Sequence, residues 1–271
     1  MPLRAILFDL DNTLLLEDEA VARALQQTSE LACRRAGVDA GLIRRAAQEA
    51  AATLFRSAHV FAYADSMGIW WGEALWGDFS GEQSGLAALR AFVPGFRQEV
   101  WAHALEAAAI SDRALVDELA AAYPTFRRAS QPIDPEAEAT LDDLGHDHQL
   151  ALVTNGAPDV QRAKLARTTL ASRFAAIVIS AEVGAGKPDP KIFHAALDAL
   201  DVASTDAVMV GDSLERDVAG ARRAGVRSVW LDRAGTAMAG PVTPDARIRS
   251  LRELRDSLIG LERVDAFPQP A

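Results

Sequence analysis

The chain has 271 residues, of which 49% are hydrophobic and 24% are charged, and its formal net charge is −10. This composition is typical of a soluble globular protein with room for one large domain, or for a core and a smaller module. The acidic balance argues against nonspecific binding to nucleic acids or anionic membranes, because both favour basic surfaces. Cys33 is the single cysteine, so an intrachain disulfide is excluded.

No targeting segment is expected. The N-terminal apolar run is short and is interrupted by Asp9 and Asp11, which does not fit a secretory signal. No stretch approaches the ~20 apolar residues of a membrane span. We therefore expect a cytoplasmic protein, by default and not from a positive signal.

The first predicted element is a buried strand, Ile6–Phe8, that leads directly into two aspartates. Asp9 and Asp11 are two residues apart, so on a strand their side chains would project to the same side. Like charges held that close repel each other, and a cation or a shared proton relieves the repulsion. Taken alone, the pattern fits either a chemical site or a solvated acidic turn.

A helical block follows the first strand. Helices are predicted over Glu17–Ala36, Gly41–Ser57, Leu86–Phe92, Gln98–Ala109 and Arg113–Tyr123. Gly37 is a good stop for the first helix, Pro94 and Gly95 separate the third from the fourth, and Ser111 is the expected N-cap of the fifth. The tryptophan-rich stretch Ser66–Gly85 is expected to be a loop or a broken helix.

From about Pro132 onward, short apolar runs alternate with helical segments. Strands are predicted at Leu150–Thr154, Ala176–Ser180, Ala207–Gly211 and Ser228–Leu231. Helices are predicted at Asp134–Gly145, Asp159–Thr168, Pro190–Leu200, Leu214–Ala224 and Leu251–Leu258. This alternation predicts right-handed crossovers and a parallel sheet that is buried on both faces.

The pattern predicts an α/β protein in two domains and a tail. Residues 1–16 and 131–262 form the α/β core, and residues 17–130 form an all-helical insertion after the first strand. Residues 263–271 contain two prolines and show no helical periodicity, so they are expected to be a flexible tail.

Polar side chains follow four of the predicted strands, at the end where function gathers in a doubly wound sheet. In strand order they are Asp9 and Asp11, then Thr154 and Asn155, then Lys187, and finally Asp212 and Asp217. Each has an ordinary alternative, since a strand-tip threonine is common, Lys187 can be a surface residue in a turn, and Asp212 can merely cap a helix. Their combined order and placement are hard to obtain by chance.

This set of residues suits phosphoryl transfer. Carboxylates alone would repel a dianionic phosphate ester, whereas Mg²⁺ takes oxygen ligands and neutralises both nucleophile and substrate. Asp9 and Asp212 can supply carboxylate ligands, and a carbonyl of the first turn can supply a third. Lys187 and Thr154 can hold nonbridging phosphate oxygens. One carboxylate can act as nucleophile, and Asp11 then suits general acid and base work.

Four segments resemble the motifs of the haloacid dehalogenase superfamily, in the right order. They are Phe8–Leu14, Val153–Gly156, Gly186–Phe193 and Gly211–Asp217. The resemblance implies a Rossmann-like parallel sheet with a helical cap inserted after the first motif, as in the phosphoglycolate phosphatase-like branch. The second motif, followed by Gln161 and Lys164, is most similar to that of the nucleotidases and N-acylneuraminate-9-phosphatases.

The resemblance also implies catalytic roles at the first motif. Asp9 would be the nucleophile and Asp11 the general acid and base. A Mg²⁺ ion would be bound by Asp9, by the backbone carbonyl of Asp11 and by Asp212.

Further roles follow from the other motifs. Thr154, Asn155 and Lys187 would contact phosphate, and Asp217 would hold a metal-bound water or orient Lys187. Arg216 departs from the family pattern, because close relatives often carry Asn there. The spacing to Asp217 is intact, so we expect function to survive.

Asp11 favours a phosphatase over a dehalogenase, because the superfamily's dehalogenases lack this second aspartate. Phosphomutases of the same fold keep it and stay an alternative. Non-enzymatic phosphoacceptors resembling receiver domains are smaller, lack a cap and carry the phosphoacceptor on a later strand. A binding protein with a vestigial site is disfavoured because every catalytic position is filled. We expect a Mg²⁺-dependent phosphatase for a small phosphorylated metabolite, such as a nucleotide or sugar phosphate, acting as a monomer or dimer.

The cap is where substrate specificity is expected. Four aromatic residues can either stack on a base or sugar ring or pack the interior of the cap: Trp70, Trp71, Trp76 and Phe79. Arg127 and Arg128 lie near the expected hinge, where they can reach an anionic group or stay solvated.

Overall fold

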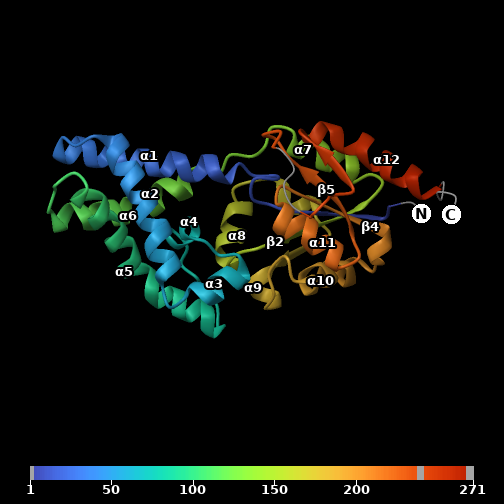
Figure 1. Ribbon diagram of the computed structural model, residues 1–271, viewed down its shortest axis with the longest axis horizontal. Coiled ribbons are helices and arrows are strands. Elements are labelled where there is room, and N and C mark those ends of the chain that lie inside the picture. Colours follow the sequence, from blue (N-terminus) through green and yellow to red (C-terminus); the bar gives the residue numbers. More distant parts are fainter. Residues whose placement is uncertain (1–2, 237–240, 267–271) are drawn as a thin grey trace. The chain divides into compact units, whose positions relative to one another are not determined.

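The computed structural model describes residues 3–236 and 241–266, and contacts divide the chain into two compact units. The sheet unit comprises Met1–Leu16, Ile133–Asn155 and Leu165–Ala271. The helical unit comprises Glu17–Pro132 and Gly156–Lys164. Figure 1 labels the main helices and strands of both units.

The segment after the second motif belongs to the helical unit. Residues 156–164 are predicted from the sequence to lie in the α/β core, whereas their contacts group them with the helices. The Gly156 N–H donates to the Met67 carbonyl at 3.0 Å. Gln161 Nε2 and Lys164 Nζ each lie 3.3 Å from Glu73 Oε1. A motif read along the chain does not reveal which neighbours the following helix packs against.

In the described part of the sheet unit, six parallel strands lie in the order β3-β2-β1-β4-β5-β6. They are β1 (Ala5–Phe8), β2 (Gln149–Thr154), β3 (Ala176–Ile179), β4 (Ala207–Gly211), β5 (Arg227–Leu231) and β6 (Ala246–Ile248). The predicted α/β class with a parallel sheet is confirmed. β6 is not predicted from the sequence, because it has three residues, of which only Ile248 is buried.

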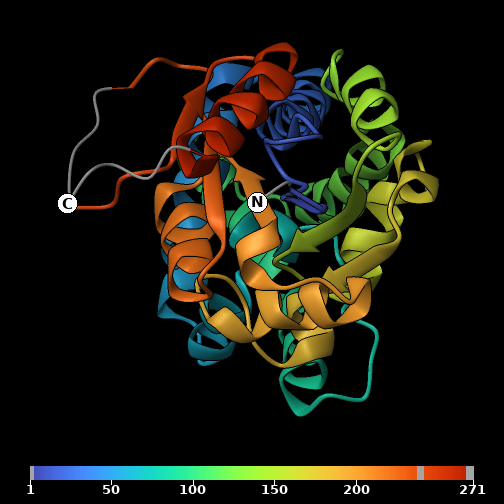
Figure 2. The ribbon, with the colours of Figure 1, turned by 90° about the vertical axis from the view of Figure 1, so that its right-hand side faces the viewer.

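Helices cover both faces of the sheet (Figure 2). The α-helices in the described part of this unit are α7 (Ala137–Leu144), α9 (Ser180–Val183), α10 (Pro190–Leu200), α11 (Ala219–Arg223) and α12 (Leu254–Ala266), and a short π-helix, Leu214–Val218, precedes α11. Phe8 packs in an apolar cluster with Leu141 of α7 and Leu254 of α12. Leu7 packs in a second cluster with Phe193 of α10. Because adjacent strand residues point to opposite faces, β1 is buried from both sides.

The last helix is longer than predicted. It begins at Leu254 and continues to Ala266, so the predicted end at Leu258 is wrong, while the flexible tail from residue 263 stays a prediction. Leu258 is buried and Leu261 is partly buried against the core, at helical spacing from Leu254. This packing continues the helix beyond the predicted end. Residues 267–271 of the predicted tail lie outside the described residues.

The helical unit consists of helices and loops. Its helices are α1 (Glu17–Ala36), α2 (Ala40–Ser57), α3 (Phe61–Met67), α4 (Trp71–Ala74), α5 (Ser84–Glu106), α6 (Arg113–Ala129) and most of α8 (Pro158–Leu165). No helix in the described ranges combines the length and the apolar character needed to cross a bilayer.

Two predictions about α5 and α6 are wrong. α5 continues through Pro94, where the sequence predicts a break, because Leu89, Val93 and Phe96 on either side of it are buried on one face. Packing of that face outweighs the backbone hydrogen bond that proline cannot donate. The N-cap of α6 is Asp112 and not Ser111, since its carboxylate accepts the Leu115 N–H at 3.1 Å.

The four aromatic residues of the tryptophan-rich stretch Ser66–Gly85 fall into two pairs. Trp76 and Phe79 are buried, which matches the interior-packing alternative. Trp70 and Trp71 are half-buried and meet edge to face with ring centroids 4.8 Å apart.

Both hinge arginines have partners within the helical unit. Arg127 is buried and pairs with Glu17 at 2.5 Å, and its guanidinium lies 5.0 Å from the Trp76 ring centroid. Arg128 donates to the Trp76 carbonyl at 2.6 Å and to Asp78 at 2.8 Å. These contacts make both arginines part of the packing of the helical unit.

Candidate active site

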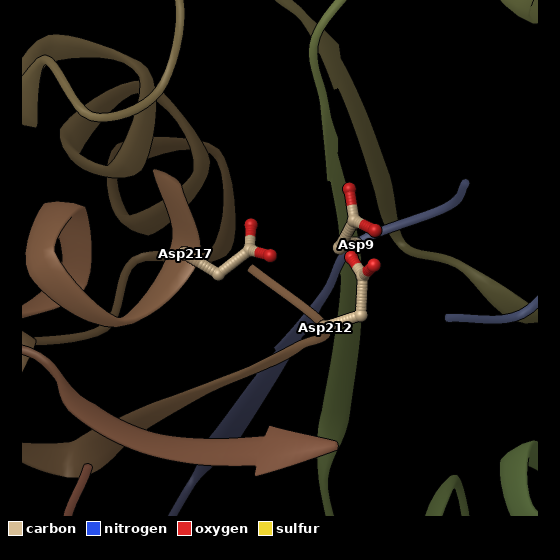
Figure 3. Close-up of side chains that lie close together, drawn as sticks. All are labelled: Asp9, Asp212 and Asp217. Carbon is tan, nitrogen blue, oxygen red and sulfur yellow. The ribbon is translucent and has the colours of Figure 1, made fainter. Parts of the chain in front are cut away.

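The candidate residues of the sheet unit lie at the carboxyl ends of neighbouring strands. Asp9 follows β1, Thr154 ends β2 and Asp212 follows β4. The sheet order places β1 between β2 and β4. Figure 3 shows the carboxylates of Asp9 and Asp212 beside each other, with Asp217 directed toward them. One oxygen from each of these three carboxylates lies within 4.8 Å of the others.

The Asp9 carboxylate is buried and is held from two directions. Thr13 Oγ1 donates to Asp9 Oδ2 at 2.8 Å, and Lys187 Nζ donates to Asp9 Oδ1 at 2.6 Å. Thr13 is not among the predicted site residues, although a hydroxyl four residues after an aspartate in the same turn can donate to its carboxylate. The two donors fix the orientation of a carboxylate at the tip of the central strand.

A compact turn carries the second aspartate. The N–H groups of Leu14 and Leu15 both donate to the Leu10 carbonyl at 2.9 Å, and Asn12 adopts a left-handed conformation with φ 59°. Asparagine tolerates this backbone region better than most residues do. The turn leaves Asp11 half-buried beside the end of β1.

Lys187 bridges two carboxylates. Its buried Nζ donates to Asp9 at 2.6 Å and to Asp217 Oδ1 at 2.7 Å, while Asp217 Oδ2 accepts the Ser213 N–H at 3.0 Å. A Cβ atom added to Gly211 would lie 2.3 Å from the Asp217 carboxylate, so only glycine leaves room for it. The geometry gives Asp217 a direct contact with Lys187.

Asn155 contacts the backbone of Lys187. Its Oδ1 accepts the Lys187 N–H at 2.7 Å, and its Nδ2 donates to the Lys187 carbonyl at 2.9 Å. This paired contact fixes the loop that carries the lysine, a role that the sequence analysis does not give to Asn155. Thr154 is buried at the end of β2, beside Asn155.

The electrostatics of the cluster are dominated by burial and by excess negative charge. Burial raises the pKa of Asp9 to about 6, and the charges of Asp217 and Asp11 add to this rise while Lys187 opposes it. Burial raises the pKa of Asp212 to about 8, with further contributions from the charges of Asp9 and Asp217. Burial alone would lower the pKa of Lys187, but its two carboxylate partners outweigh that effect and raise it.

The donor set fits a hard divalent cation. One oxygen from each of Asp9, Asp212 and Asp217 lies within 4.8 Å of the others, so a cation among them would meet carboxylate ligands. The pKa values of Asp9 and Asp212 are raised chiefly by burial, so a bound cation would stabilise their ionised forms. Carboxylate oxygens are the ligands that Mg²⁺ prefers.

Known proteins match this chain in sequence and in fold. The family model described as haloacid dehalogenase-like hydrolase matches residues 3–225. A phosphoserine phosphatase from Thermus thermophilus is 44% identical over 254 residues, which cover 93% of this chain and 98% of that protein. An N-acylneuraminate-9-phosphatase from Rattus norvegicus is 35% identical over 125 residues, covering 46% of this chain and 50% of that protein.

Solved structures share the fold over nearly the whole chain. The putative hydrolase YfnB from Bacillus subtilis, whose structure was determined bound to magnesium, has a TM-score of 0.67 and 20% identity, and the match covers 95% of this chain and 99% of that one. A 2-haloacid dehalogenase from Pseudomonas syringae has a TM-score of 0.59 and 28% identity, with the same shares covered.

Proposed function

Because the chain belongs to the haloacid dehalogenase-like hydrolases and is a phosphatase of that family, we propose that it hydrolyses a small phosphomonoester through an aspartyl-phosphate on Asp9, with Mg²⁺ as cofactor. The observation that carries the proposal is the buried Asp9 carboxylate, held between Thr13 and Lys187 at the tip of the central strand.

The reaction has two steps. In the first, an Asp9 oxygen attacks phosphorus, the bond from phosphorus to the ester oxygen breaks, and Asp11 gives its proton to the leaving oxygen. In the second, Asp11 takes a proton from water, the water oxygen attacks phosphorus, and the bond to Asp9 breaks to release phosphate. A leaving alcohol needs the proton from Asp11, which is why this residue favours a phosphatase over a dehalogenase.

Asp9, Asp212 and the Asp11 carbonyl are the proposed metal ligands. When bound, Mg²⁺ neutralises charge on the carboxylates and on the phosphoryl group. Thr154 and Lys187 are the proposed phosphate contacts, and Lys187 supplies a fixed positive charge. Asp217 and Asn155 position Lys187, one through its ammonium and the other through its backbone. Arg216 has no role in this scheme.

The proposed substrate is an amino-acid phosphomonoester of the O-phosphoserine type. The identity of 44% to a phosphoserine phosphatase over nearly the full length of both chains supports this choice. A phosphorylated sugar acid is the second candidate, supported by the N-acylneuraminate-9-phosphatase match over about half of each chain. The two-domain division into core and cap, the cytoplasmic location and the monomeric or dimeric state stay predictions.

A substrate panel tests the proposal. Release of inorganic phosphate is measured from O-phospho-L-serine, sugar phosphates, nucleoside monophosphates, phosphoglycolate and p-nitrophenyl phosphate, each with Mg²⁺ and with EDTA. We expect Mg²⁺-dependent release from p-nitrophenyl phosphate and the highest kcat/KM with O-phospho-L-serine. No release from any ester with Mg²⁺ present would contradict a phosphatase, and transfer of phosphate between hydroxyls without release would indicate a mutase.

A further inference from the structure

A segment outside the four motifs contacts both turns that carry the proposed metal ligands. It comprises Trp230–Arg233, the end of β5 and the two residues after it. Trp230 lies beside Gly211 in the parallel pairing of β5 with β4, so the indole lies next to the turn that begins at Asp212. We name this segment the β5 clamp.

Trp230 contacts the backbone of the Asp212 turn. Its indole Nε1 donates to the Asp212 carbonyl at 2.8 Å, and the residue is 5% exposed. A buried indole N–H without an acceptor is unfavourable, so this bond restrains the turn as well as the ring. The Asp212 carboxylate is not used in this contact and stays available for other partners.

Arg233 contacts the turn that carries Asp11. Its guanidinium donates to the Asn12 carbonyl, to the Thr13 carbonyl at 2.9 Å and to Asp134 Oδ2 at 2.6 Å. The planar fork of an arginine can hold several acceptors in one fixed arrangement. The two carbonyls directly follow Asp11, whose own carbonyl is a proposed metal ligand.

The β5 clamp is itself held in place. Asp232 is buried, its N–H donates to the Ile248 carbonyl at 2.8 Å, and its carboxylate accepts from Thr236 at 3.0 Å and from Arg247. The Arg247 guanidinium also lies 4.8 Å from the Trp230 ring centroid. These contacts make the segment a rigid support for both turns.

We propose that Trp230 and Arg233 are positioning residues that set the spacing between the two turns which bind Mg²⁺. This inference rests on the proposed function, because it assumes the metal ligands Asp9, Asp11 and Asp212. A metal site needs its ligands placed within a fraction of an ångström, and outer contacts that orient ligands strongly affect metal affinity. Neither residue belongs to the four motifs, and neither has a role in the scheme above.

Two substitutions test the proposal by direct Mg²⁺ binding. Trp230→Phe removes the indole N–H and keeps an aromatic ring, and Arg233→Lys keeps the charge and loses the fork. We expect the Mg²⁺ dissociation constant from isothermal titration calorimetry to rise roughly 10-fold in each variant. The concentration of Mg²⁺ that half-activates p-nitrophenyl phosphate hydrolysis should rise in parallel, while KM at saturating Mg²⁺ stays within about twofold.

Two control substitutions distinguish a positioning role from a general effect of substituting a tryptophan or an arginine on Mg²⁺ binding. Trp101→Phe removes an indole that is 0% exposed and lies in the helical unit. Arg255→Lys changes an arginine whose side chain is 37% exposed, against 32% for Arg233, and which also holds a backbone carbonyl, that of Asp143 at 2.8 Å. Both controls should bind Mg²⁺ as the unsubstituted protein does.

The outcomes are distinguishable. An unchanged Mg²⁺ dissociation constant in either clamp variant, or an equal rise in the controls, overturns the positioning role while the proposed function stands. If the unsubstituted protein binds no Mg²⁺, the proposed function fails and the positioning role fails with it. If Trp230→Phe does not yield folded protein, Arg233→Lys decides the question by the same measurement.

Discussion

Replacing Asp212 by asparagine should stabilise the metal-free protein and abolish its response to Mg²⁺. Burial and the charges of Asp9 and Asp217 raise the pKa of Asp212 to about 8, from an ordinary value of 3.8. In the metal-free folded protein its ionised form is therefore unfavourable. Asparagine keeps the shape of the side chain and cannot ionise, so the unfavourable charge is removed together with a proposed ligand.

The sign and size of this change in stability follow from the linkage between proton binding and folding. Because the folded pKa of Asp212 lies above the unfolded value, its contribution to stability is fully present below the unfolded pKa and is lost as pH rises toward 8. One pK unit corresponds to about 1.4 kcal/mol, so the rise from 3.8 to about 8 sets a ceiling of roughly 6 kcal/mol above pH 8. At pH 7, which is 3.2 pH units above 3.8, the corresponding ceiling is roughly 4 kcal/mol. Because protonation of Asp9 relieves part of the repulsion in the unsubstituted protein, we expect Asp212→Asn to recover about half of this, about 2 kcal/mol or roughly 5 °C in Tm.

Thermal unfolding in EDTA, at pH 5 and at pH 8, measures this gain. Asp212→Asn should unfold at a higher temperature than the unsubstituted protein, with the larger difference at pH 8. Addition of Mg²⁺ should raise the Tm of the unsubstituted protein only, and phosphatase activity of the variant should fall by at least about 100-fold. Asp256→Asn, at an exposed carboxylate of α12, is the control. A variant less stable than the unsubstituted protein in EDTA at pH 8, or one that Mg²⁺ still stabilises, would refute the reasoning.

Three further outcomes are expected. The Mg²⁺ concentration for half-maximal p-nitrophenyl phosphate hydrolysis should fall at least about 10-fold from pH 6 to pH 8, because Asp212, with a pKa of about 8, must lose its proton to bind metal; a flat profile would contradict this. Asp11→Asn should lower kcat/KM for O-phosphoserine far more than for p-nitrophenyl phosphate, since kcat/KM reports the first step and nitrophenolate leaves in that step without a proton; equal losses in kcat/KM would count against Asp11 as the acid. Gly211→Ala should lower both kcat and Tm, at about 1–3 kcal/mol in stability, because its Cβ would lie 2.3 Å from the Asp217 carboxylate; an unaltered variant would show that the site is less tightly packed.

The parallel sheet and the site at its edge were predictable because their signals are local. Short apolar runs between helical patterns locate β1, β2 and β4, and polar residues directly after them lie at one edge of a parallel sheet. Asp9 and Asp212 needed no knowledge of packing to be singled out. The motif resemblance then ranked two neighbouring aspartates, Asp9 and Asp11, that local physics alone treats as equivalent.

Contacts between distant parts of the chain were not predictable from local pattern. Arg233 and Asn12 are 221 residues apart, and Asn155 and Lys187 are 32 apart. Nothing in the residues around Arg233 distinguishes it from a solvated arginine. Its hydrogen bonds depend on strand order, which a single sequence does not specify.

In the helical unit, the burial of charged residues was likewise not predictable from local pattern. Glu17 and Arg127 form a buried ion pair across 110 residues, although charged residues at helix ends are usually solvated. The continuous helix through Pro94 is a second case, since packing of α5 outweighs a local breaking signal. In both, tertiary packing decides the outcome against the local preference.

Covalent trapping at Asp9 tests the proposed chemistry. The Asp11→Asn protein, in which removal of phosphate from Asp9 should be slowed, is mixed with p-nitrophenyl phosphate and Mg²⁺ and quenched with borohydride, which reduces an acyl phosphate to an alcohol. Mass spectrometry of the peptide that contains residue 9 should then show homoserine in place of Asp9, and only when substrate is present. An unmodified Asp9 during turnover, or reduction at a different carboxylate, would contradict Asp9 as the nucleophile.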